Sequence, residues 1–194
     1  MEFKDSQTMI NLARAFAGES QARNRYTMYA YQARKEGSEY IARLFEETAD
    51  NEFAHAKEFF NLIILHGGNM DNIDIDAGYP FAIGTTTENL GFAADGENQE
   101  HVDAYPAFAE CAKQEGFMDV YEKFTMIAEI EGLHHRVFTD AQNQLQNGSL
   151  YKRPEQYSWR CINCGHVHFS TEPWDTCPVC HHPTGFADAG IKKN

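Results

Sequence analysis

The chain has 194 residues and a net charge of −13. Residues 152–194 carry +1, so the preceding part carries −14, and an acidic body of this kind argues against nucleic acid and anionic membranes as partners. No apolar run approaches the ~20 residues that a membrane span requires, and the N-terminus lacks the pattern of a secretory signal. We therefore expect a cytoplasmic protein that binds neither membrane nor nucleic acid.

Helical periodicity predicts four helices in the first three quarters of the chain, over about residues 6–35, 38–66, 85–115 and 117–147. Residues 67–84 are rich in Gly, Asn and Asp and predict a long connection between the second and third helices. Thr85 and Glu88 fit a capping box at the start of the third helix. Pro106 lies inside that helix and should kink or interrupt it.

Each predicted helix carries an apolar seam at steps of three and four residues, and each seam is interrupted by glutamate or histidine. The seams are Met9, Leu12, Phe16, Glu19, Tyr26; Ile41, Phe45, Thr48, Glu52, His55, Phe59, Leu62; Leu90, Ala93, Glu97, Glu100, Ala104, Ala107, Cys111; and Val120, Phe124, Ile127, Glu131, His134, Phe138, Ala141, Leu145. Residues of one seam share the face that packs against other helices. Buried charge of this density is prohibitive unless metal cations cancel it.

The charged seam residues match the ligand pattern of a di-metal site in a helix bundle. Two i, i+3 pairs each place a carboxylate and an imidazole on one face, and the other two helices each supply a glutamate. The candidate ligands are Glu19, Glu52, His55, Glu97, Glu100, Glu131 and His134. A single Glu-x-x-His pair is most often a solvated surface pair, but two such pairs on core seams are not explained that way. Ligands rich in carboxylate favour iron or manganese over zinc.

Three glycines adjoin the candidate ligands: Gly18, Gly96 and Gly132. A glycine inside a helix costs about 1 kcal/mol relative to alanine, so three beside ligands need a reason. Close helix packing and room for a small oxygen substrate are equally good explanations.

Residues 149–156 form a polar linker, and the remaining segment changes to short strand-like pieces with Gly and Pro turns. Its four cysteines form two CxxC pairs, Cys161–Cys164 and Cys177–Cys180, which indicate a tetrathiolate metal site rather than disulfides. Zinc ribbons and iron rubredoxins share this spacing. Taken alone the pattern favours structural zinc, whereas beside a bundle expected to bind two irons it favours iron. The fifth cysteine, Cys111, has a seam position that predicts a buried thiol.

These motifs together resemble those of the rubrerythrin family. The resemblance rests on Ala17-Gly18-Glu19-Ser20, Glu52-Phe53-Ala54-His55, Gly96-Glu97-Asn98-Gln99-Glu100 with Tyr105-Pro106, Glu131-Gly132-Leu133-His134, and Cys177-Pro178-Val179-Cys180. It implies a mainly α protein: a ferritin-like antiparallel four-helix bundle with one long crossover, followed by a small β-rich rubredoxin-like metal domain. The implied boundaries are 1–148 for the bundle, 149–156 for the linker and 157–194 for the second domain.

The resemblance also implies roles for the candidate residues. Two irons would be bridged by Glu52 and Glu131, with Glu19, Glu97 and His134 as terminal ligands, whereas Glu100 and His55 would exchange at one iron between oxidation states. Tyr26 and Tyr105 would donate hydrogen bonds to ligands, although packing of core aromatics also explains them. A third iron would sit in the tetracysteine site, where zinc is the alternative.

The implied activity is reduction of hydrogen peroxide to water. Electrons would come from NAD(P)H through a reductase or rubredoxin partner and pass through the rubredoxin-like iron, in a head-to-tail homodimer or a tetramer. A ferroxidase of the ferritin type is the alternative that uses the same bundle. A binding module with a structural zinc ribbon is a further alternative.

Overall fold

The computed structural model describes residues 2–70 and 72–191, so residues 1, 71 and 192–194 of the predicted domains lie outside the described part. The described helices are α1 (Gln7–Lys35), α2 (Glu39–Gly67), α3 (Thr86–Gln99), α4 (Tyr105–Glu115) and α5 (Met118–Gln146), with a π-helical turn η2 (Glu100–Ala104) and 3-10 turns η1 (Phe3–Asp5) and η3 (Thr184–Phe186). Strands β1 (Tyr157–Arg160) and β2 (Val167–Ser170) follow the helices.

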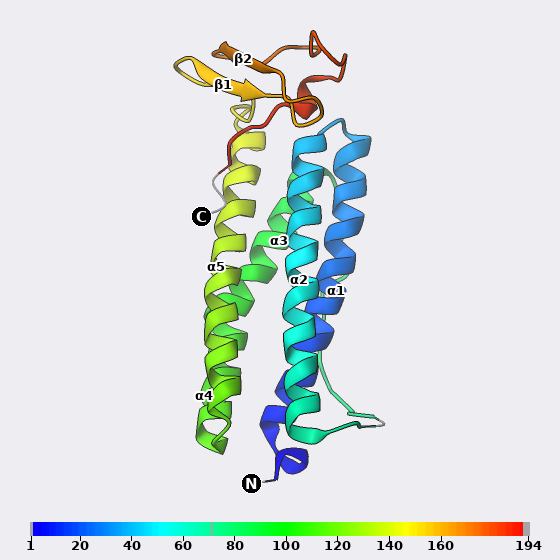
Figure 1. Ribbon diagram of the computed structural model, residues 1–194, viewed down its shortest axis with the longest axis vertical. Coiled ribbons are helices and arrows are strands. Elements are labelled where there is room, and N and C mark those ends of the chain that lie inside the picture. Colours follow the sequence, from blue (N-terminus) through cyan, green and yellow to red (C-terminus); the bar gives the residue numbers. More distant parts are fainter. Residues whose placement is uncertain (1, 71, 192–194) are drawn as a thin grey trace.

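The helices run side by side along the long axis of the molecule, and residues 68–70 and 72–85 cross the full length of the bundle between α2 and α3 (Figure 1). Gly37, with φ of 82°, permits the tight turn that joins α1 to α2. The capping box predicted at Thr85 forms, since its side chain accepts from the backbone of Glu88 while the Glu88 carboxylate accepts from Thr85 N. The predicted fold class, a ferritin-like bundle with one long crossover and a small two-stranded appendage, is confirmed.

The buried faces agree with the predicted seams on α2 and α5, and differ on α1 and α4. All seven seam residues of α2 are buried. On α1, Phe16 remains 37% exposed and Ala15 is buried in its place.

The third predicted helix is interrupted at η2, and its register changes there. Pro106 has no N–H to donate and its ring would clash with the carbonyl four residues earlier, so the chain passes through a π-turn and restarts with Pro106 in the first turn of α4. The wider turn rotates the following residues by about one position. Tyr105, Ala109 and Ala112 are therefore buried, whereas Ala107 and Cys111 of the predicted seam are exposed and half-buried.

The C-terminal segment caps the end of the bundle where α1 and α5 finish and α2 begins (Figure 1). Strands β1 and β2 pair antiparallel, and Trp159, Trp174 and two of the cysteines form a small core. Arg43 of α2 donates to Ile162 O at 3.0 Å, and Gly185 approaches Gly37 so closely that no side chain would fit between them. The division at 148 and 156 stays a prediction, while the contacts place this segment firmly on its own bundle.

Candidate metal centres

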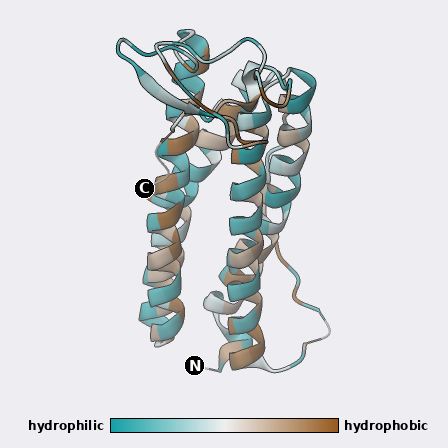
Figure 2. Cartoon of the chain, turned by 45° about the horizontal axis from the view of Figure 1, so that its top comes forward, coloured by the Kyte–Doolittle hydropathy of each residue, from teal (hydrophilic) through white to brown (hydrophobic). Residues whose placement is uncertain are grey.

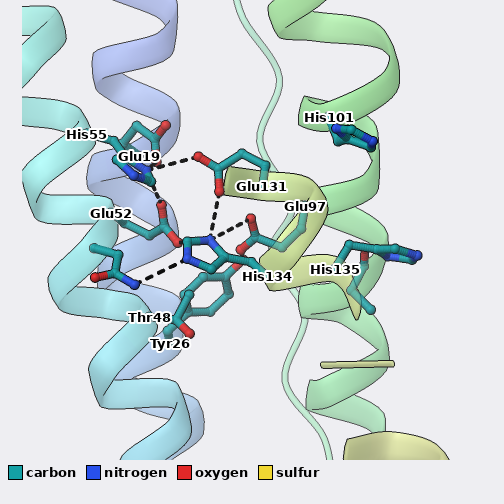
Figure 3. A network of polar contacts seen from close by, with 12 residues as sticks. Glu19, Tyr26, Thr48, Glu52, His55, Glu97, His101, Glu131, His134 and His135 are labelled. Carbon is teal, nitrogen blue, oxygen red and sulfur yellow. Dashed lines mark hydrogen bonds and ion pairs between the residues drawn. The ribbon is translucent and has the colours of Figure 1, made fainter. Parts of the chain in front are cut away.

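Six of the seven predicted ligands meet in the middle of the bundle, at one level (Figure 3). They come from α1 (Glu19), α2 (Glu52, His55), α3 (Glu97) and α5 (Glu131, His134), and all are buried. In each Glu-x-x-His pair the two side chains stack along one helix face, which brings the imidazole Nδ1 to 3.1 Å from Glu52 Oε2 and to 2.7 Å from Glu131 Oε2.

The side chains divide into two overlapping groups of potential ligands. One group is Glu19, Glu52, His55 and Glu131, the other is Glu52, Glu97, Glu131 and His134, and in each the ligand atoms lie within 4.8 Å of one another. His55 Nδ1 is 2.9 Å from Glu131 Oε1, and His134 Nδ1 is 3.2 Å from Glu52 Oε1, so each imidazole reaches across to the other pair. Because Glu52 and Glu131 belong to both groups, their carboxylates can serve two metal positions.

The chemistry of these side chains fits divalent cations. Each of Glu19, Glu52, Glu97 and Glu131 has one buried carboxylate oxygen that faces an imidazole Nδ1, at distances from 2.9 to 3.9 Å. Buried carboxylates grouped this closely are costly, and bound cations remove that cost. The protein therefore carries a di-metal centre formed by two carboxylate and histidine sites.

Protonation balances the charges of the centre when no metal is bound. Burial raises the pKa of the Glu19 and Glu97 carboxyls well above their usual range, and the charges of Glu52 and Glu131 raise it further. Burial alone would lower the pKa of His55, but hydrogen bonds to Glu131 and Glu52 raise it to about 9, and that of His134 is raised for the same reason. Burial opposes ionisation of Glu52 too, yet hydrogen bonds from both imidazoles bring its pKa to about 2. Two imidazolium ions thus take the place of two metal ions.

Two buried tyrosines donate hydrogen bonds to the terminal glutamates. Tyr26 O–H donates to Glu97 Oε1, and Tyr105 O–H donates to Glu19 Oε1 at 2.5 Å. Burial raises the pKa of both phenols well above the usual range, so both keep their protons. The contacts are those that the resemblance implies.

Glu100, the seventh predicted ligand, stands apart from both groups. It belongs to the π-turn η2 and is only half-buried, and its carboxylate lies beside Gly18 and Tyr79 of the crossover. Here His55 therefore completes the first group, and Glu100 does not.

The three glycines beside ligands have different roles. A Cβ on Gly132 would lie 2.8 Å from the ring of His101, so this glycine serves close packing of η2 on α5. A Cβ on Gly96 would meet only Arg25, at 3.8 Å, and one on Gly18 would meet Glu100 and Tyr79 at 3.6 Å. Gly18 and Gly96 thus leave space beside the centre. For these two glycines, room for a small substrate is the better of the two explanations.

Asn51 of α2 is a contact of the centre that the sequence did not reveal. Its amide nitrogen Nδ2 lies 3.2 Å from Nε2 of His134, whereas Nδ1 of the same ring faces the carboxylates. The amide N–H donates to Nε2 and so holds the ring of His134 in its orientation. No sequence pattern marks such a residue, because asparagine beside a glutamate on a helix is common.

Replacing Asn51 by alanine is expected to weaken metal binding without unfolding the bundle. Loss of a hydrogen bond to a ligating histidine costs about 10–100-fold in metal affinity. Anaerobic titration of the metal-free variant with Fe²⁺ against a competing chelator measures the loss. Asn61→Ala, the same change at an exposed position of α2, is the matched control. Equal affinities in the two variants would show that Asn51 does not position His134.

The second metal site is built by the four cysteines of the C-terminal segment, whose ligand atoms also lie within 4.8 Å of one another. Cys161 and Cys180 sulfurs are 3.7 Å apart, as are those of Cys164 and Cys177, and none forms a disulfide. Each CxxC turn closes with a backbone hydrogen bond of 2.9 Å, from Gly165 to Cys161 O and from His181 to Cys177 O. These residues form a rubredoxin-like four-cysteine metal site.

The fold and the two sites define a class of protein: a ferritin-like di-metal bundle joined to a rubredoxin-like metal site. A family model described as rubrerythrin matches residues 11–142, and one described as the rubredoxin-like domain of rubrerythrin matches residues 159–186. Among relatives, the rubrerythrin of Porphyromonas gingivalis is 46% identical over 184 residues, which cover 94% of this chain and 90% of that protein. The rubrerythrin of Nitratidesulfovibrio vulgaris is 41% identical, over 93% and 92% of the two chains.

Solved structures give the same result. Partially reduced nigerythrin superposes with a TM-score of 0.64 at 31% identity, over 94% of this chain and 88% of that chain. The bacterioferritin of Desulfovibrio desulfuricans has a TM-score of 0.67 at 22% identity, which supports the fold alone. The chain belongs to the rubrerythrin family and is a di-iron protein of that family. Within the described residues, no helix is both long and apolar enough to cross a membrane.

Proposed function

We propose that this protein is a peroxidase that reduces hydrogen peroxide to water and protects against oxidative stress. One observation carries the proposal: a di-metal centre with two shared carboxylates and a four-cysteine metal site occur in the same chain. Two irons held by the glutamates and histidines of the centre would supply the two electrons that cleavage of the O–O bond requires. Iron in the tetracysteine site, for which zinc is the alternative, would return electrons singly from an NAD(P)H-dependent reductase or rubredoxin.

The side chains around the centre have separate tasks in this proposal. Glu52 and Glu131 would each bind at both metal positions. Tyr26 holds the carboxylate of Glu97 in orientation, and Tyr105 holds that of Glu19. Asn51 holds the ring of His134. The hydrogen bonds of His55 to described residues are all made by Nδ1, so its ring has no comparable anchor. This supports the family's exchange of His55 for Glu100, since the less constrained imidazole is the one that leaves.

We further propose a head-to-tail dimer, alone or within a tetramer, in which electrons pass between subunits. Glu131 precedes Gly148 by seventeen residues, about 25 Å of helix at 1.5 Å per residue, so the cysteine site of a chain caps the bundle far from its own centre. An apolar groove of about 620 Å³ on the α1–α2 hairpin, lined by Phe16, Phe60 and Ile64, offers a surface for a second copy. In Figure 2, hydrophobic residues gather at the lower end of this hairpin, beside the N-terminus. The free thiols of the cysteine site suit a reducing, cytoplasmic location.

Stopped-flow oxidation of the fully reduced protein tests the activity. We expect hydrogen peroxide to oxidise the di-iron centre much faster than dioxygen does at equal concentration. Faster oxidation by dioxygen would instead favour an oxidase or a ferroxidase, and a cage-sized particle in gel filtration would favour the ferritin-like alternative.

A further inference from the structure

A cavity of about 210 Å³ lies between the crossover and the di-metal centre. We call it the vestibule; its lining includes Gly18, Arg25, Tyr79, Glu100 and Tyr105. At about 30 Å³ per molecule, such a volume holds roughly seven waters. The vestibule is therefore large enough for a small hydrated solute.

The inner wall of the vestibule touches the centre through single side chains. Tyr105, which lines the cavity, donates its O–H to Glu19 at 2.5 Å, and Gly18 directly precedes Glu19 in α1. Glu100 lines the same wall beside Gly18. A solute in the vestibule is thus separated from the centre by one layer of side chains, to which Glu100 belongs.

The outer wall is a fixed part of the crossover. Tyr79 O–H donates to Arg14 O at 2.8 Å, and Arg14 Nε donates to Asp76 O at 3.0 Å. These two bonds tie residues 76–79 to α1. The crossover, which crosses the whole bundle, therefore covers the cavity at the level of the centre.

A guanidinium group lies in the lining of the vestibule. Arg25 donates Nε–H to Gln21 at 2.7 Å, and its side chain lines the cavity. A guanidinium group only donates hydrogen bonds, so it pairs with an oxygen-bearing solute. The lining thus favours a small oxygen compound over an apolar one.

Gly18 leaves the vestibule open at its inner end. A methyl group at this position would lie 3.6 Å from Glu100 Oε1 and 3.6 Å from Tyr79 Cε1. Both are ordinary contact distances, so alanine would fit without strain while bridging the gap between the two walls.

We propose that the vestibule admits hydrogen peroxide to the centre, that Arg25 binds the peroxide oxygen there, and that Gly18 and Tyr79 set the size limit that excludes bulky organic hydroperoxides. This inference rests on the proposed peroxidase function. It names a path and a specificity that the metal ligands themselves do not determine.

Gly18→Ala tests the path. In stopped-flow oxidation of the reduced protein, we expect hydrogen peroxide to react about tenfold more slowly than with the parent, because a blocked approach raises the barrier to reaction. The iron content and the visible spectrum of the oxidised centre should stay unchanged, and the metal-free variant should melt no lower than the parent. Asn24→Ala, at an exposed position of α1 that does not line the vestibule, is the control.

Tyr79→Ala tests the size limit from the other side. The parent should react with cumene hydroperoxide far more slowly than with hydrogen peroxide, and this variant should narrow the difference by about tenfold. Unchanged rates in both variants would overturn the vestibule while leaving the peroxidase proposal intact. Slow oxidation of the parent by hydrogen peroxide would instead overturn the peroxidase proposal.

Discussion

Binding of two Fe²⁺ ions to the metal-free centre at neutral pH is expected to release about two protons or more, because metal ligands bind in their deprotonated form. Two come from His55 and His134, whose raised pKa values keep both imidazoles protonated at pH 7. The pKa values of Glu19 and Glu97 are raised too, so any proton that these carboxyls hold adds to the count. Acid therefore weakens binding and alkali strengthens it.

The product of the two association constants should rise by about two powers of ten or more per pH unit while both imidazoles stay protonated in the free protein. The slope should fall as the pH passes about 9, where His55 loses its proton without metal. An anaerobic titration with a pH indicator in weak buffer counts the protons. It is done in a variant with Cys161, Cys164, Cys177 and Cys180 replaced by serine, so that thiols contribute none. Release of fewer than two protons would contradict the charge balance described for the centre.

Cys177→Ser is expected to abolish turnover driven by NAD(P)H and a reductase while leaving a single turnover intact. Cys177 is fully buried in the core of the cysteine site, and loss of a ligand thiolate should lower steady-state peroxidase activity by about a hundredfold or more. The di-iron centre lies elsewhere in the bundle, so the chemically reduced variant should reduce one equivalent of hydrogen peroxide at the parent rate. Cys111→Ser, a thiol outside the cluster, is the matched control.

The same variant also tests transfer between subunits. Glu131→Gln removes a carboxylate shared by both groups of the centre and should inactivate it. Heterodimers that combine a Cys177→Ser subunit with a Glu131→Gln subunit keep one intact cysteine site and one intact di-iron centre on different chains. Turnover restored in such heterodimers supports a head-to-tail dimer. Turnover no higher than that of the two single variants, each measured as a homodimer, argues against it.

Helical periodicity predicted the metal centre well because its ligands are buried at regular steps. On α2 and α5 the chain is uninterrupted, and there Glu52, His55, Glu131 and His134 lie where three- and four-residue steps put them. Periodicity failed at η2, where a π-turn adds a residue to one turn and moves the buried face from Ala107 to Tyr105 and Ala109. Pro106 marked the interruption, but not the size of the turn that it produces.

Contacts between distant elements carry no local signal. Asn51 meets His134 across 83 positions of sequence, and the backbone of Ile191 donates to the hydroxyl of Tyr40 across 151. Both depend on how whole elements pack, which the spacing of residues within one helix does not determine. The vestibule is of the same kind, because α1, η2 and the crossover form it together.

Acids and imidazoles of the bundle meet at one level and, in our account, bind two irons there. Anomalous diffraction at the iron edge from crystals of iron-replete protein tests this. Two peaks should lie between Glu52 and Glu131, one beside His134 and one beside His55 or Glu100. Iron-replete crystals with no peak between these helices, or with a single peak at full occupancy, would contradict the claim.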